Sequence, residues 1–290
     1  MSNRLKIVYF GSSGDLSFRP FEALLQSSHE ILAVVVNECP SIEQGIDLIP
    51  IDQQDSIQSV AFKNKIQILK FNHKITELGS AIESLKPDVI VTSCFAHKIP
   101  SSILTIPKLA SLNLHPSLLP KYRGPDPLFW QIRNAVIETG VTIHLMNNQF
   151  DAGDIVAQHS VNVKPSMNIS DLEKKLAIES SRLLIQAFQN IHNKIVLAKP
   201  QDTKISSYYS YPKVSDFKIP ETWNARRVYH FMKATESIAS YFPLMIDGEE
   251  MRLVQAIDFN AQGTIDLTLE GNQITFPCRA GYVKAEFLTL

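Results

Sequence analysis

Short apolar runs recur along the first two thirds of the chain, and amphipathic segments separate them. Five runs rich in β-branched residues predict strands at Leu5–Phe10, Ile31–Val36, Ile66–Phe71, Val89–Ser93 and Ala110–Leu114. The segments between them predict helices, which we place at Phe18–Gln26, Ile75–Leu85 and Pro125–Asn134. Continuous apolar strands that alternate with helices are typical of a parallel sheet covered on both faces. The pattern therefore predicts an α/β fold with a mostly parallel sheet.

Two alternating segments and a long helical segment follow. Gly140–Met146 and Ile155–Val163 alternate like strands on either side of a loop. A helical period then extends over Ser170–Asn193, and it opens with Ser-Asp-Leu-Glu, which is typical of a capping box. Pro200 and the Ser/Tyr-rich stretch after it break the periodicity and predict a linker. We therefore expect two domains, at residues 1–199 and 200–290.

The second predicted domain has a different pattern. One helix is predicted at Trp223–Thr235, and four short alternating runs follow it. These runs lie at Leu244–Ile246, Met251–Phe259, Thr264–Leu269 and Gln273–Phe276. Between them stand the turn-forming dipeptides Asp247-Gly248, Gln262-Gly263 and Gly271-Asn272. Short strands joined by such turns predict a small antiparallel, β-rich barrel or meander.

Composition narrows the class of protein. The 290 residues include 28 Lys and Arg against 29 Asp and Glu, a net charge of -1, and 44% of them are hydrophobic. This is typical of a folded globular chain, and it excludes whole-protein electrostatics as the main attraction to nucleic acids or membranes. A local basic patch that binds such a partner is compatible with this net charge. Because the longest early apolar run, Ile31–Val36, is too short for a signal or membrane segment, we expect a cytoplasmic protein with no membrane partner.

Cysteine and histidine spacing argues against disulfides and metals. Cys39, Cys94 and Cys278 are widely spaced and form no Cys-x-x-Cys, which fits a reducing compartment. The eight histidines include no His-x-x-x-His pair, so we expect no metal site. A Ser-His-Asp hydrolase is unsupported because Gly-x-Ser-x-Gly is absent.

The turn after the first predicted strand contains Gly11, Ser12, Ser13 and Gly14. Small residues at the start of a helix let backbone N–H groups approach an anion, although such turns also serve tight packing alone. The turn lacks the third glycine of a dinucleotide-binding fingerprint, but Asn37-Glu38 stands where a ribose-binding acid would lie. An NAD(P)-binding oxidoreductase therefore stays open as an alternative from another class, beside a binding protein without catalysis.

The most informative segment runs from Leu112 to Pro125. Asn113 and His115 are two residues apart on a predicted strand and therefore share a face. They lie at the carboxyl edge of the predicted parallel sheet, where α/β folds bind ligands. Two prolines and a glycine constrain the loop that follows. Its Lys121-Tyr-Arg123 group either contacts an anionic ligand or forms a solvated surface.

A second segment, Gly140–Ile155, carries further candidates. Asp151 and Asp154 flank Ala-Gly in a loop between two predicted strands, a spacing that often only makes a turn. His144 alternates with Thr and Met on the preceding strand, and we expect a structural role for it. His97, after the fourth strand, is at most a pocket-lining candidate.

Taken together, Asn113–Gly124, Glu138–His144 and Phe150–Asp154 resemble the formyltransferase family that uses 10-formyltetrahydrofolate. The opening Tyr9-Phe-Gly11 and the later Tyr211–Val214 are most similar to its methionyl-tRNA formyltransferase branch. The resemblance covers most of the first domain and the second only loosely. It implies a Rossmann-like catalytic domain at 1–199 and a smaller, barrel-like (OB-like) domain at 200–290, which binds the acceptor or mediates oligomerisation.

The resemblance also implies roles for single residues. The catalytic residues are Asn113, His115 and Asp151. Asn113 and a protonated His115 would stabilise the oxyanion that forms when an amine attacks the formyl carbon. Asp151 would favour the imidazolium and help to move the amine proton to the folate nitrogen. The folate co-substrate is expected at Cys94, Phe95, Ala96, Asn147, Asn148, Gln149 and Phe150. Substrate binding is expected at Gly11, Ser12, Ser13, Ser117, Leu119 and Arg123.

The formyl acceptor is left open by the sequence. Methionyl-tRNA is the family default, a small amine such as an amino sugar nucleotide is the competitor, and water would give a hydrolase. Glu38–Gly45 has no Lys or Arg where the tRNA-modifying branch has a basic loop. Residues 200–290 contain 9 Lys and Arg against 11 Asp and Glu. Both observations argue against tRNA. A basic face is nevertheless available from Lys213, Lys218, Arg226, Arg227 and Lys233.

Overall fold

The computed structural model describes residues 4–37, 56–72, 74–164, 167–189 and 196–288. Cys39 and Glu38–Gly45 lie outside the described residues. The chain forms two compact units, each built from several segments. The first unit comprises Met1–Gly124, Thr139–Val161 and Glu173–Tyr208. The second comprises Pro125–Glu138, Asn162–Leu172 and Tyr209–Leu290. These units group residues by contact, and the domain boundary expected at residue 199 stays a prediction.

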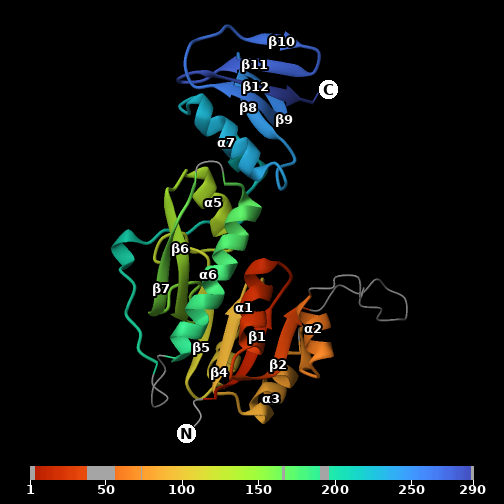
Figure 1. Ribbon diagram of the computed structural model, residues 1–290, viewed down its shortest axis with the longest axis vertical. Coiled ribbons are helices and arrows are strands. Elements are labelled where there is room, and N and C mark those ends of the chain that lie inside the picture. The colour runs from red at the N-terminus through yellow and green to blue at the C-terminus, as the bar shows by residue number, and fades with distance from the viewer. Residues whose placement is uncertain (1–3, 38–55, 73, 165–166, 190–195, 289–290) are drawn as a thin grey trace, which may run out of the picture. The chain divides into compact units, whose positions relative to one another are not determined.

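A seven-stranded sheet in the order β3-β2-β1-β4-β5-β6-β7 forms the centre of the first unit (Figure 1). Strands β1 to β5 are parallel, and β6 runs antiparallel to β5. The strands are β1 (Lys6–Gly11), β2 (Glu30–Asn37), β3 (Gln67–Phe71), β4 (Val89–Ser93), β5 (Ala110–His115), β6 (Glu138–Leu145) and β7 (Ile155–Asn162). This confirms the mostly parallel α/β fold that the sequence predicts.

Helices cover both faces of this sheet. They are α1 (Asp15–Leu25), α2 (Ile57–Lys63), α3 (Ile75–Leu85), α4 (Ser101–Leu104) and α6 (Ile169–Gln189). Val8 and Phe10 of β1 share a core cluster with Ile82 of α3. Tyr9, on the opposite face, contacts Phe21 of α1, with ring centroids 5.5 Å apart. Burial on both faces explains why the strands are continuous apolar runs.

The helix boundaries differ from the predictions in two ways. The short helices α2 and α4 were not predicted, because seven and four residues hold too few periods for an amphipathic pattern. The capping box predicted at Ser170 is wrong. Helix α6 begins at Ile169, and the Asn168 side chain accepts a hydrogen bond from the Asp171 N–H at 2.8 Å. Residues 190–193 of the predicted helix lie outside the described residues.

The second unit contains a five-stranded antiparallel sheet in the order β10-β11-β12-β9-β8. Its helices are α5 (Pro127–Arg133) and α7 (Ala225–Thr235). Its strands are β8 (Phe242–Ile246), β9 (Glu249–Asn260), β10 (Thr268–Glu270), β11 (Gln273–Pro277) and β12 (Tyr282–Phe287). A second, smaller antiparallel sheet was predicted, but β12 was missed because its buried positions include the small residue Ala285. The run predicted from Thr264 is a strand only from Thr268.

Helix α5 belongs to the core of the second unit, although its sequence position predicts membership of the first domain. Phe129 contacts the rings of Phe217 and Phe231, at centroid distances of 4.8 and 6.1 Å.

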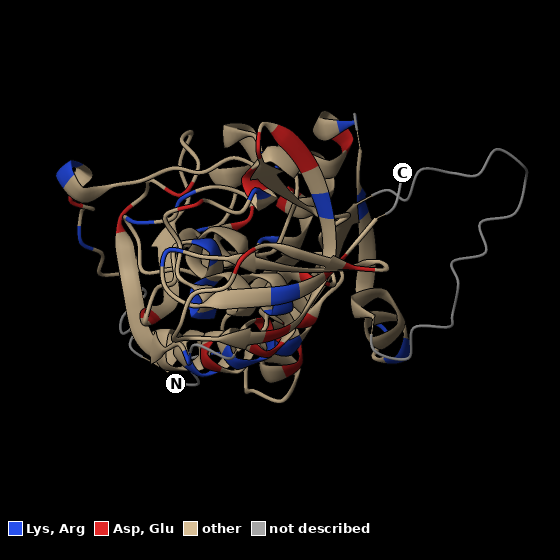
Figure 2. Cartoon of the chain, turned by 90° about the horizontal axis from the view of Figure 1, so that it is seen from above, with Lys and Arg blue, Asp and Glu red and all other residues tan. Residues whose placement is uncertain are grey.

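Acidic and basic residues are interspersed along the ribbon (Figure 2). None of the described helices is long and apolar enough to cross a membrane.

Candidate active site

The end of β5 and its antiparallel neighbour β6 bring three polar side chains together. Asn113 and His115 share a face of β5, as their spacing predicts. The strand register places His144 of β6 opposite Asn113, and Thr142 opposite His115. Asp151 reaches the same place from the loop between β6 and β7. All of these residues belong to the first unit.

The Asp151 carboxylate is the centre of the cluster. Its Oδ1 lies 3.3 Å from Asn113 Nδ2, 3.6 Å from His115 Nδ1 and 3.5 Å from His144 Nε2. Its Oδ2 accepts the Gly124 N–H at 2.9 Å. The structure thus brings the three expected catalytic residues together. It also adds His144, a residue that was expected to be structural, because register between strands cannot be derived from spacing within one strand.

Backbone carbonyl groups determine which ring nitrogens carry protons. His115 Nε2 lies 2.7 Å from the Tyr122 carbonyl oxygen, so this nitrogen donates and Nδ1 faces Asp151. His144 Nδ1 donates to the Leu145 carbonyl at 2.8 Å, which leaves Nε2 to accept from Asn113 Nδ2 at 3.1 Å. Asn113 therefore bridges His144 and Asp151 with its two N–H groups. Its 3.3 Å contact with Asp151 is the longer of the two.

Burial and the neighbouring charges shift the pKa values of His115 and Asp151. Burial lowers the pKa of His115, and this effect outweighs the Asp151 carboxylate, which acts in the opposite direction. Burial alone would raise the pKa of Asp151, but His115, His144 and the Gly124 N–H together hold it well below its usual range. The site thus combines an ionised carboxylate with a neutral imidazole near neutral pH. The protonated His115 expected from the resemblance is therefore not the resting form.

Hydrogen bonds within the loop after β5, and from this loop to Thr142 and Gln201, hold it in place. Ser117 is fully buried and donates to the Lys121 carbonyl at 2.8 Å. Leu119 is 3% exposed, and its N–H donates to Thr142 Oγ1. Arg123 donates to Gln201 from both Nε and Nη2. For Ser117 and Leu119 these contacts favour a role in shaping the loop, and contact with the acceptor stays a prediction for all three expected residues.

The two segments expected to bind the folate lie close to each other. Cys94–Ala96 follow β4 at the carboxyl edge of the sheet, and Asn147–Phe150 lead into Asp151. Lys98, two residues beyond the first segment, has its Nζ 5.8 Å from the centre of the Phe150 ring in the second. The Phe95 side chain packs against Phe10 and Phe71. It is partly buried against the core cluster of this unit, and its contact with the folate stays a prediction.

The turn at Gly11, Ser12 and Ser13 does not present a free helix end to an anion. The Glu173 carboxylate lies beside this turn, since a Cβ on Gly14 would lie 3.1 Å from Glu173 Oε1. A Cβ on Gly11 would lie 2.6 Å from Ser17 Oγ, so the glycine serves close packing. A bound pyrophosphate would have to displace this carboxylate. The geometry therefore disfavours the nicotinamide alternative.

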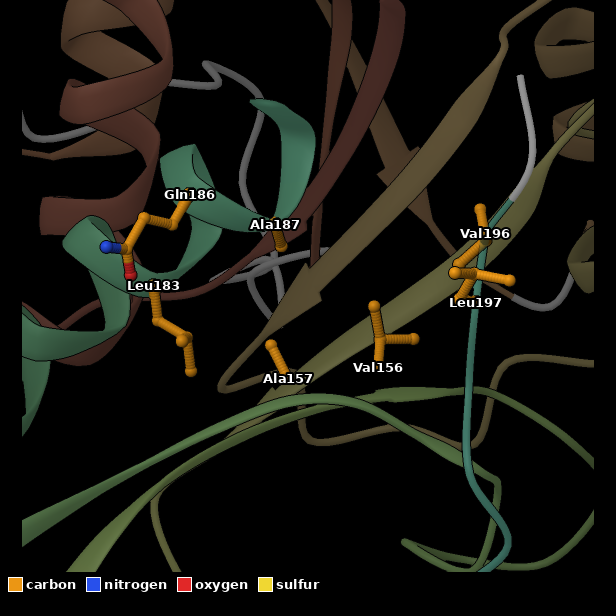
Figure 3. A pocket seen from close by; sticks show the side chains of 7 residues that line it. All are labelled: Val156, Ala157, Leu183, Gln186, Ala187, Val196 and Leu197. Atoms are coloured by element: carbon orange, nitrogen blue, oxygen red, sulfur yellow. The ribbon is translucent and has the colours of Figure 1, made fainter. Parts of the chain in front are cut away.

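The other candidate sites among the described residues have fewer reactive side chains. No group of three or more His, Cys, Asp or Glu among the described residues could hold a metal ion. His97 stacks on Phe71. A cavity of about 350 Å³ next to β7 and α6 has no titratable side chain in its lining (Figure 3). Its lining residues are Val156, Ala157, Leu183, Gln186, Ala187, Val196 and Leu197.

The cluster combines a neutral histidine, a carboxylate and a carboxamide at the carboxyl edge of a parallel sheet. This set of groups is typical of an α/β group-transfer enzyme that works without a covalent nucleophile. Comparison with known proteins identifies the group that is transferred. A family model described as formyl transferase matches residues 5–188, and the chain belongs to this family. It is a formyltransferase whose co-substrate is a formyl-tetrahydrofolate.

The curated relatives and the solved structure with a similar fold differ in the acceptor that they name. The methionyl-tRNA formyltransferase of Malacoplasma penetrans is 31% identical over 268 residues, which cover 90% of this chain and 81% of that protein. The corresponding protein of Ehrlichia canis is 31% identical over 91% of this chain and 84% of its own length. The N-formyltransferase of Helicobacter canadensis, solved with folinic acid and dTDP-3-aminofucose, has a TM-score of 0.69 at 19% identity. That likeness covers 97% of this chain and 98% of that one.

Proposed function

We propose that the protein transfers the formyl group of 10-formyltetrahydrofolate to the amino group of methionyl-tRNA, with Asn113, His115 and Asp151 as catalytic residues. The observation that carries the chemistry is the Asp151 carboxylate beside the neutral His115 and the Asn113 amide. Attack of the amine on the formyl carbon forms a C–N bond and a tetrahedral oxyanion. Collapse of this species breaks the bond to N10 of the folate, which leaves with a proton.

The geometry supports a role for each side chain. His115 Nδ1 carries a lone pair and takes the proton of the attacking amine, while the adjacent carboxylate stabilises the imidazolium. The same proton then goes to the folate nitrogen. Asn113 keeps its shorter contact with His144, and its other N–H, which makes only the longer 3.3 Å contact with Asp151, is the donor for the oxyanion. Loss of one such donor costs about 10²–10³ in rate.

A cationic cavity in the second unit supports methionyl-tRNA as acceptor. Its volume is about 280 Å³, and no Asp or Glu is among its lining residues. Lys164, Arg226, Arg227 and His230 contribute the basic side chains. Lys and Arg side chains bind phosphate groups, and phosphate contacts dominate the affinity of proteins for nucleic acids. The nearly identical numbers of acidic and basic residues therefore conceal a local concentration of positive charge.

A small amine, such as that of an amino sugar nucleotide, is the second candidate acceptor. The absence of Lys and Arg from Glu38–Gly45 favours it, as does the excess of acidic over basic residues in 200–290. The two acceptors differ in size and charge. They therefore predict different responses to Arg226→Ala, which should weaken use of tRNA and leave a small amine unaffected.

Labelled 10-formyltetrahydrofolate, offered in parallel with methionyl-tRNA and with an amino sugar nucleotide, tests the proposal. Asp151→Asn should lower the rate of label transfer by about 10² or more, because the imidazolium loses its counter-charge. Asp154→Asn is the matched control, since this carboxylate lies in the same loop but outside the cluster. Label in the sugar, or release of formate without an acceptor, would overturn the tRNA assignment. Equal rates for both variants would overturn the role of Asp151.

A further inference from the structure

One side chain of the linker uses all of its hydrogen-bonding capacity on the two catalytic loops. Gln201 Nε2 donates to the carbonyl oxygens of Asp151 and Gly153, at 2.8 and 2.7 Å. Its Oε1 accepts from Arg123 Nε at 3.1 Å and from Arg123 Nη2 at 2.7 Å. A carboxamide has two N–H donors and one oxygen with two lone pairs. Gln201 is therefore saturated by these four contacts.

The rest of this segment follows the same two loops. Lys199 exchanges two backbone hydrogen bonds with Ile155, just after the Asp151 loop. Ser207 accepts the Arg123 N–H through its carbonyl and the Tyr122 N–H through its hydroxyl, both at 2.9 Å. Residues 199–208 thus bind to the loop that carries Asp151 and to the loop whose Tyr122 carbonyl orients His115.

Both loops contain backbone conformations that need such support. Tyr122 and Asp151 have φ values of 59° and 52°, in the left-handed region that side chains with a Cβ seldom adopt. Such residues persist only where the surrounding structure fixes them. The Asp151 carbonyl, which Gln201 binds, belongs to the residue whose carboxylate contacts His115 and Gly124. Holding this carbonyl fixes the direction in which the carboxylate points.

We propose that Gln201 is a positioning residue for formyl transfer, which clamps the Asp151 loop to Arg123 and so keeps the Asp151 carboxylate against His115. The inference rests on the proposed roles of Asp151 and His115. On this proposal, the linker that joins the catalytic residues to the antiparallel sheet of the second unit also takes part in the reaction.

Two substitutions separate the halves of the clamp. In Gln201→Met, the new side chain has a volume similar to that of glutamine, and all four hydrogen bonds are lost. Gln201→Glu retains the two acceptor contacts with Arg123 but cannot donate to the carbonyls of Asp151 and Gly153. The control is Asp202→Ala, because the neighbouring Asp202 side chain caps the N–H of Lys204 and is exposed.

We expect both Gln201 variants to lower kcat about 10- to 100-fold, with the KM for 10-formyltetrahydrofolate changed less than about threefold, because displacement of a catalytic group by about 1 Å costs rate and spares binding. Asp202→Ala should leave both constants unchanged. In Gln201→Met, the pKa of His115 followed by NMR should fall below its value in the unmodified protein, since the carboxylate that raises it moves away.

An unchanged kcat together with an unchanged His115 titration in Gln201→Met would overturn the inference. If that variant does not fold, wild-type kcat in a folded Gln201→Glu would overturn it equally. A failure of the proposed function is recognised separately. In that case the unmodified protein does not transfer formyl groups, while the His115 titration still reports whether Gln201 positions the carboxylate.

Discussion

Replacing Gly153 by alanine should impair catalysis more than stability, because the added methyl group would press on the Asp151 loop. A Cβ at this position would lie 1.8 Å from the carbonyl oxygen of Leu145 and 2.8 Å from its carbon. Real Cβ contacts are longer than 3.0 Å, so the two backbones must separate by more than 1 Å. Leu145 ends β6, and the loop moves more easily than the strand. Asp151, two residues away, moves with it.

The distances around Asp151 determine the expected loss of rate. Asp151 Oδ1 lies 3.3 to 3.6 Å from its three side-chain partners, so a shift of this size breaks or lengthens each contact. A misplacement of about 1 Å can cost about 10² in rate, which is about 2.7 kcal/mol of transition-state stabilisation. We expect kcat/KM for Gly153→Ala to fall by about this factor while the far-UV circular dichroism spectrum stays that of the folded protein.

Steady-state consumption of 10-formyltetrahydrofolate in the presence of the acceptor measures the effect. Gly79→Ala is the control, because Gly79 lies within α3 and a Cβ there meets nothing within 4 Å. It should leave the kinetics unchanged and raise the free energy of unfolding by about 0.5–1 kcal/mol, since alanine is the better helix former. A Gly153→Ala enzyme with wild-type kcat/KM would refute the assignment of the Asp151 loop to the reaction.

Two further predictions concern the histidines. His144→Ala should lower kcat at least about tenfold and destabilise the fold by about 1–3 kcal/mol, because the Asn113 amide loses its buried acceptor; urea unfolding and kinetics measure the two effects. Wild-type kcat in this variant would show that His144 has only the structural role expected from the sequence. The second prediction concerns pH. Burial lowers the pKa of His115 below its ordinary value of 6.5, so the unfolded chain binds a proton more readily than the folded one. The corresponding stability is fully present above about pH 6.5 and declines as the pH falls below it. His115→Asn should reduce this slope in urea unfolding between about pH 5 and 7.5, and an identical slope in both proteins would contradict the neutral assignment.

The sequence by itself determined the class of fold and part of the site. Strands buried on both faces must be apolar throughout, so β1 to β5 are readable as runs separated by helices. The spacing of Asn113 and His115 placed them on one face, because side chains alternate along a strand. The family resemblance supplied Asp151. Each of these conclusions depends on local periodicity or on a contiguous motif.

The tertiary structure decided what depends on residues distant in the sequence. His144 joined the site because β6 pairs with β5 in one particular register. The Glu173 carboxylate lies beside the turn before α1, although 159 positions separate it from Gly14. Burial made His115 neutral, since desolvation depends on the whole surrounding core. Gln201 contacts both catalytic loops only after the chain has folded. Periodicity describes one segment at a time, whereas register, desolvation and hydrogen bonds between loops exist only when segments meet.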